Sequence, residues 1–147
     1  MATMTRVWLA ALAAGWMNAA SAQMPLARLE LGGAVIDVEV ATSDAEQRLG
    51  LMYRSSLASD HGMIFVHPED TRLCMWMKNT LIPLSVAFLD GEGRILNIED
   101  MAPQSEDSHC ALSSARYALE MNKGWFSTHG IKTGDRVEGI KSLPAQK

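Results

Sequence analysis

Short apolar runs rich in β-branched residues recur along almost the whole chain, and turn-forming residues separate them. Runs of about four to eight residues between such turns are typical of β-strands. Two of the turns, Gly32-Gly33 and Gly91-Glu92-Gly93, have the composition of hairpin turns. We therefore expect eight strands, at residues 26–31, 34–41, 62–67, 72–78, 84–90, 94–101, 116–121 and 135–140.

One stretch carries a helical start signal instead. Ser43-Asp44-Ala45-Glu46 is a capping box, whose serine and glutamate side chains satisfy free N–H groups at a helix start. The predicted helix runs through Gly50, which is unfavourable inside a helix and indicates close packing against another segment. Residues 124–129 predict one further helical turn. Because strands and helices do not alternate, we expect a mainly β fold, a compact β sandwich or barrel of about eight short strands with one or two short helices.

The first 22 residues have the pattern of a secretory signal peptide. Arg6 precedes an apolar stretch at residues 7–17, and Ala20-Ser21-Ala22 forms a cleavage site of the A-x-A kind. The alternative, an uncleaved membrane anchor, needs about 20 apolar residues, and polar residues interrupt this run. The sequence therefore predicts a periplasmic or secreted protein that starts at Gln23 and has no stable membrane insertion.

Length and charge limit what the exported chain can be. Residues 23–147 suffice for a single globular domain, and we expect a monomer. The whole chain has 13 Lys and Arg against 17 Asp and Glu, a net charge of −4, with no basic stripe. This balance argues against nucleic acid as a partner, which leaves a small ligand or an envelope protein.

The stretch CMWMKNT, residues 74–80, is the most unusual part of the sequence. On a strand, Cys74, Trp76 and Lys78 share one face, while Met75 and Met77 share the other. In one interpretation the methionines fill the core and Trp76 lies on a partly covered face. In the alternative, the thioethers of Met75 and Met77 bind copper(I), which soft sulfur ligands select.

Cys74 and Cys110 are the two cysteines of the chain. In an exported protein, two cysteines most simply form one disulfide. The alternative is a thiol nucleophile beside His109, but residues adjacent in sequence rarely reach the geometry of a catalytic pair. The sequence therefore predicts a disulfide between Cys74 and Cys110.

Motifs of known catalytic chemistry are absent from the sequence. There is no G-x-S-x-G, H-E-x-x-H, C-x-x-C or phosphate-binding loop, and the four histidines follow no metal-ligand spacing. The sequence therefore favours a non-enzymatic protein without a cofactor over an enzyme.

Several motifs together identify a family. They are RLGLMYR at residues 48–54, GMIF at 62–65, WMKNTLIPL at 76–84, RYALEMNKG at 116–124 and GIKTGD at 130–135. With these motifs the chain resembles the domain of unknown function 192 family, small bacterial and archaeal proteins that are often exported. The resemblance covers about residues 34–140 and implies a compact, mainly β sandwich, with no established activity.

The resemblance also supplies candidate site residues, because polar groups stand inside these otherwise apolar motifs. Such groups form either a buried hydrogen-bonded network or the lining of a pocket, and we expect Glu120 to pair with Lys78 or Arg48. A pocket here implies an exported binding or accessory domain that recognises a small polar ligand, a saccharide or an envelope partner. The candidate ligand-binding residues are Arg48, Trp76, Lys78, Asn79, Thr80, Glu120 and Asn122.

Overall fold

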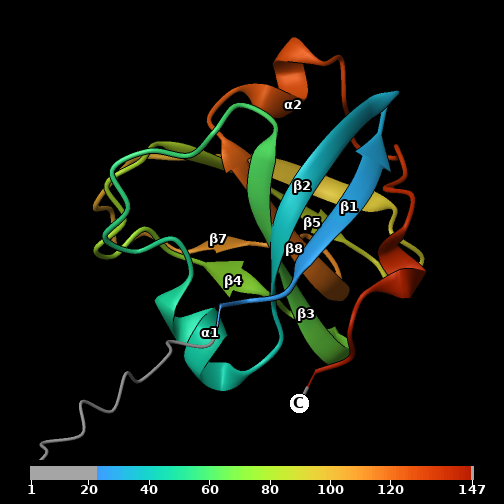
Figure 1. Ribbon diagram of the computed structural model, residues 1–147, viewed down its shortest axis with the longest axis horizontal. Helices are drawn as coiled ribbons and strands as arrows, with labels where there is room; N and C mark the ends of the chain where they lie inside the picture. Colours follow the sequence, from blue (N-terminus) through green and yellow to red (C-terminus); the bar gives the residue numbers. More distant parts are fainter. Residues whose placement is uncertain (1–22, 147) are drawn as a thin grey trace, which may run out of the picture.

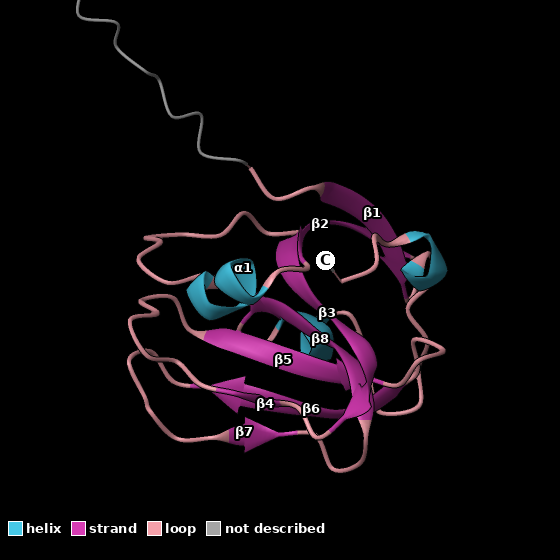
Figure 2. Cartoon of the chain, turned by 90° about the horizontal axis from the view of Figure 1, so that it is seen from below, coloured by secondary structure: helices cyan, strands magenta, loops and turns pink. Residues whose placement is uncertain are grey.

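The computed structural model describes residues 23–146, and its main feature is a six-stranded sheet (Figure 1). The strands are β1 (Leu26–Leu31), β2 (Ala34–Ala41), β3 (His61–Thr71), β5 (Leu84–Leu89), β6 (Ile95–Met101) and β8 (Ala115–Asn122). They lie in the order β1-β2-β3-β8-β5-β6, which places β3 and β8 in the middle. Two short strands, β4 (Cys74–Met75) and β7 (His109–Cys110), form a separate two-stranded sheet (Figure 2).

Neighbouring strands are antiparallel except for β2 and β3, which are parallel. A parallel pair needs a crossover connection, and here it contains helix α1 (Asp44–Leu49). The predicted capping box is present, since Ser43 accepts from the Glu46 N–H and the Glu46 side chain accepts from the Ser43 N–H. The helix ends at Leu49, one turn earlier than expected. Gly50 follows it with φ +47°, a conformation that favours glycine.

The predicted fold class is confirmed: the described residues form a mainly β, sandwich-like fold with eight strands and two short α-helices. The strands at 26–31 and 34–41 have the predicted bounds and the predicted Gly32-Gly33 hairpin. The strand expected at 62–67 continues to Thr71 through an irregularity after Val66. Of the strand expected at 72–78, only Cys74–Met75 forms a strand, β4. The second helix, α2 (Trp125–Thr128), follows β8 as expected.

The prediction of a closing strand at residues 135–140 is wrong. This segment makes isolated bridges to both edges of the sheet, through Glu138 to Glu30 on β1 and through Arg136 to Arg94 beside β6. Because it serves two edges in turn, it forms no continuous ladder with either, and it ends in a 3₁₀ turn at Ile140–Ser142. The described strands consequently do not close into a barrel, and a loop links the two sheet edges.

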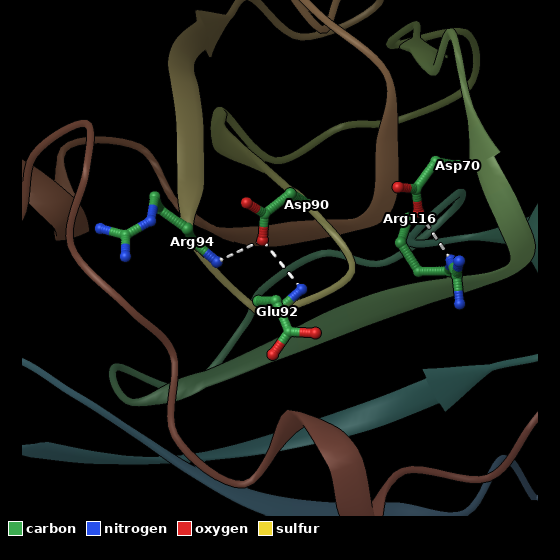
Figure 3. Close-up of polar contacts among 5 residues, drawn as sticks. All are labelled: Asp70, Asp90, Glu92, Arg94 and Arg116. Carbon is green, nitrogen blue, oxygen red and sulfur yellow. Dashed lines mark hydrogen bonds and ion pairs between the residues drawn. The ribbon is translucent and has the colours of Figure 1, made fainter.

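The predicted turn between β5 and β6 is present, and backbone hydrogen bonds to a carboxylate hold it (Figure 3). One carboxylate oxygen of Asp90 accepts hydrogen bonds of 2.9 Å from the N–H groups of Glu92 and Arg94. Nearby, Arg116 on β8 donates to Asp70 on β3 at 2.8 Å. These contacts lie at the end of the sheet where β3 and β5 end and β8 begins.

Both faces of the sheet are buried, each under its own hydrophobic core. Along β3, Ile64 and Val66 belong to the first core, while Met63 and Phe65 belong to the second. The first core includes α2 and the C-terminal segment, and the second includes Leu51 and the segment that carries β4. A central strand covered on both faces has no solvent side, so a polar residue on it needs a specific reason.

No helix in the range 23–146 has both the length and the apolar character needed to cross a membrane. The predicted signal peptide at residues 1–22 lies outside the described residues.

Candidate functional site

The chain between residues 73 and 82 covers the second core and is anchored by the predicted disulfide. Cys74 and Cys110 face each other across β4 and β7 and are bonded, which confirms the predicted pair. After Met75 the chain leaves the strand, and the Met77 N–H donates to the Ser105 carbonyl. Exposure still alternates as predicted, because Met77 is fully buried while Trp76 is 47% exposed.

A groove of about 440 Å³ lies between α1, the end of β3 and β4, which Figure 1 shows next to one another. Its lining includes Trp76, which is exposed, and two arginines, Arg48 and Arg72, neither of which forms an ion pair within residues 23–146. Burial lowers the pKa of His67 in the same lining, so this imidazole is neutral at pH 7. We call this space the Trp76 groove; its lining is Asp44, Gln47, Arg48, Phe65, His67, Thr71, Arg72, Leu73, Cys74, Met75 and Trp76.

A smaller cavity of about 30 Å³ adjoins the groove, since Gln47, Arg48, Phe65, Met75 and Trp76 line both. Its other lining residues include Thr80 and Glu120. We call it the Glu120 cavity. Its complete lining is Gln47, Arg48, Leu49, Gly50, Leu51, Met52, Phe65, Met75, Trp76, Thr80 and Glu120.

Glu120 lies two residues before the end of the central strand β8, opposite Met63 on β3 and Val86 on β5. It is only 4% exposed, and its carboxyl makes no hydrogen bond or ion pair with any described residue. Burial raises the pKa of Glu120 to about 8, because the charged form loses its hydration without gaining a partner. Glu120 is therefore a neutral carboxylic acid at pH 7.

The predicted pairing of Glu120 with Lys78 or Arg48 is wrong. The Lys78 ammonium lies 5.2 Å from the centre of the Trp76 ring, and the Lys78 side chain is exposed. Arg48 is also exposed, although it is one of the residues that line the cavity. Both cations keep their hydration at the surface, which costs less than following the carboxylate into the core.

The structure gathers four of the seven candidate residues, Arg48, Trp76, Thr80 and Glu120, around one cavity. The two asparagines hold loops instead. Asn79 has φ +54° and donates to the Tyr53 hydroxyl at 3.0 Å. Asn122 donates to the carbonyls of residues 57 and 58 at 2.9 and 3.2 Å.

Sequence reasoning missed Gln47, Met52, Phe65, His67 and Arg72 as lining residues. A signal for two of them was present, because Met52 belongs to the motif RLGLMYR and Phe65 to GMIF. All four motifs that lie between residues 48 and 124 contribute to the Glu120 cavity. No local pattern marks Gln47, His67 or Arg72, because their place in the groove depends on how the crossover folds back.

The methionines proposed for copper(I) have different surroundings. Met77 is fully buried in the second core, and Met75 is half-buried and lines both the groove and the cavity. Within the described chain no group of three or more His, Cys, Asp or Glu side chains is arranged to hold a metal ion. Copper(I) binding by Met75 and Met77 stays an untested alternative.

A second hollow, of about 560 Å³, lies on the other side of α1. Its charged groups satisfy each other, because Arg54 donates to both carboxylate oxygens of Glu39. Arg48 and Arg72 in the Trp76 groove have no such partner among the described residues. Free cations beside an exposed aromatic ring make the Trp76 groove the better candidate site.

The sequence profile of the DUF192 family, described as an uncharacterized ACR, matches residues 27–139. The chain belongs to the DUF192 family. The match contains every residue of the Trp76 groove and the Glu120 cavity. No protein with a curated description matches the chain.

Two solved structures of similar proteins share the fold. One is from Sinorhizobium meliloti 1021 and is described as a proposed transcription regulator; it is 36% identical, with a TM-score of 0.76, over 79% of this chain and 95% of that one. The other is a protein of unknown function from Novosphingobium aromaticivorans DSM 12444. It is 34% identical, with a TM-score of 0.75, over 78% of this chain and 86% of that one.

Proposed function

We propose that this DUF192 protein is an exported, non-enzymatic binding domain that recognises an acidic saccharide in the Trp76 groove. The observation that carries the proposal is the meeting of Trp76, 47% exposed, with Arg48 and Arg72 in one groove of about 440 Å³. Ligand sites typically combine an apolar platform with a few polar groups that fix orientation. Here the platform is an indole ring.

The chemistry of the groove selects the ligand class. The C–H face of a sugar ring packs on an aromatic ring. A sugar hydroxyl can donate to the side-chain oxygen of Gln47, whose amide nitrogen already donates to the carbonyls of Ala41 and Val66. Arg48 and Arg72 favour a carboxylate, which a guanidinium binds through paired hydrogen bonds. Asp44 is the one acidic residue of the lining, so the groove keeps a net positive charge on a chain with a net charge of −4.

We also propose that the protein is exported and does not bind nucleic acid. The disulfide between Cys74 and Cys110 supports a role in an oxidising compartment. A regulator that contacts DNA directly needs a basic surface, and the surplus of acidic residues does not favour one. The proposal for this chain therefore does not include contact with DNA.

Isothermal titration calorimetry with glucuronic acid tests the proposal. The wild-type protein should bind this acid more tightly than glucose, and Trp76→Ala should weaken binding by about tenfold or more because the stacking surface is lost. Arg72→Gln should remove the preference over glucose.

Two matched controls complete the experiment. Leu81→Ala removes an apolar side chain of similar exposure, 48%, outside the groove, and Arg136→Gln removes an exposed arginine elsewhere. Both should bind as the wild type does. Equal losses in Leu81→Ala and Trp76→Ala, or no binding of glucuronic acid by the wild type, would contradict the proposal.

A further inference from the structure

Glu120 has no role in the packing that would explain a carboxyl group at this position. It occupies a core-facing site of β8 between Met63 and Val86, where an apolar side chain needs no partner. Every fully enclosed side-chain nitrogen or oxygen among the described residues has a hydrogen-bond partner, yet the Glu120 carboxyl has none. Its oxygens are therefore not sealed in the core but reach the surface of the Glu120 cavity.

The size of the cavity limits what can meet this carboxyl. About 30 Å³ is enough for a group of the size of a water molecule, which needs roughly 10–15 Å³. A single hydroxyl or amino group therefore fits. Because the cavity adjoins the Trp76 groove, a ligand in the groove can extend such a group into it.

Charge distinguishes the two groups. Arg48 is the one charged residue of the cavity lining besides Glu120, and Arg72 adds a second cation in the groove. The neighbours of Glu120 on β3 and β5 carry no charge, and neither do the lining residues Met75, Trp76 and Thr80; the nearby cation Lys78 lies over the Trp76 ring and does not line the cavity. Two cations oppose an ammonium group but not a hydroxyl. A hydroxyl both donates and accepts a hydrogen bond, which matches a protonated carboxyl.

We propose that the ligand inserts one hydroxyl group into the Glu120 cavity, where the carboxyl group of Glu120 forms hydrogen bonds with it. This inference rests on the proposed function, since it assigns the buried end of the same site. Glu120 is then the residue that separates hydroxylated acids from other small acids. Binding of the hydroxyl weakens when Glu120 ionises, because a carboxylate can no longer donate and must be hydrated.

A pair of ligands reports on the hydroxyl groups together, and the pH series and the Glu120 variants isolate the one that meets Glu120. Glucuronic acid and oxane-2-carboxylic acid share the six-membered ring and the carboxylate, but the second has no hydroxyl. By calorimetry at pH 7, the wild type should prefer glucuronic acid by about tenfold or more, and this preference should fall at pH 9. The carboxylates of both ligands are ionised at both pH values, and the His67 ring is neutral at both.

Two variants of Glu120 give opposite expectations. Glu120→Gln keeps a donor and an acceptor without a titratable proton, so the preference should persist at both pH values. Glu120→Leu removes both and should lose the preference at both. A wild-type preference that neither pH nor Glu120→Leu changes would overturn the inference but leave the proposed function intact. If the wild type binds neither acid, the proposed function fails and the inference fails with it.

Discussion

Glu120 is the residue at which the sequence and the structure differ most instructively. Its position inside the motif RYALEMNKG identified it as a polar group in an apolar strand. The choice between a network and a pocket required knowledge of what covers β8. Neither Lys78 nor Arg48 follows the carboxyl inward, so the acid stays neutral beside a cavity.

The raised pKa of Glu120 predicts how stability depends on pH. The folded protein holds this proton up to about pH 8, while the unfolded chain releases it near the ordinary value of 4.5. Between these values the folded state binds more protons, so the free energy of unfolding should fall as the pH rises, by about 3 kcal/mol between about pH 5 and pH 8. Urea unfolding at a series of pH values measures this slope.

Glu120→Gln should remove that slope and make the protein more stable than the wild type near pH 8, because the amide carries no charge at any pH. Glu106→Gln, in an exposed loop, is the matched control and should keep the wild-type slope. Parallel pH profiles for the wild type and Glu120→Gln would show that Glu120 is ionised at neutral pH and has a partner.

At the scale of elements, the groove depends on α1 and on the two-stranded sheet of β4 and β7. The sequence predicted the capping box and the disulfide, since both follow from local composition. It did not predict that α1 ends at Gly50, where an added Cβ would lie 3.3 Å from Phe65 Cζ. Gly50 therefore packs closely against Phe65, as a glycine at this position indicated, but the sequence could not show that the neighbouring side chain comes from β3.

The disulfide between Cys74 and Cys110 should be the main restraint on the wall that carries Trp76. It spans 36 positions of the sequence, and on the chain-entropy argument its removal should cost about 2–4 kcal/mol of stability. Chemical unfolding of Cys74→Ala/Cys110→Ala should show this loss, and reductant should produce a similar loss in the wild type. Thiol titration of the denatured wild type should find no thiol before reduction and two after it.

For this prediction Leu112→Ala is the control, because Leu112 is 80% exposed close to Cys110. It should unfold as the wild type does, with or without reductant. If reductant leaves the wild-type unfolding curve unchanged, the disulfide is not a significant restraint.

At the scale of the whole molecule, the sequence predicted most strands but not their arrangement. The hairpin of β1 and β2 follows from the Gly32-Gly33 turn, whereas the parallel pairing of β2 with β3 depends on a crossover that no local pattern specifies. The segment 135–140 has strand-like composition, yet it bridges two sheet edges in turn. Long-range pairing of this kind depends on the curvature of the sheet, which composition does not encode.

In the candidate site, too, single residues could be predicted from the sequence but their arrangement could not. Arg48, Trp76, Thr80 and Glu120 could be selected from the sequence because each is a polar or aromatic residue in a motif of the family. Their convergence on one cavity brings together α1, β4 and β8, which are distant in sequence. Arg72 and His67 join them only through the path of β3 beyond Val66.

The central claim is that the Trp76 groove binds an acidic saccharide, and proton–nitrogen NMR during a titration with glucuronic acid tests it most directly. The indole N–H signals of Trp76 and Trp125 report on opposite sides of the sheet, because Trp125 belongs to the first core and its indole donates to Asp60 at 3.0 Å. Trp76→Phe assigns the first signal. The account predicts that the Trp76 indole signal and the backbone signals of Arg48 and Arg72 move with one saturation curve while the Trp125 indole signal stays in place. Shifts confined to residues outside the groove, or no shift at a saturating concentration, would contradict it.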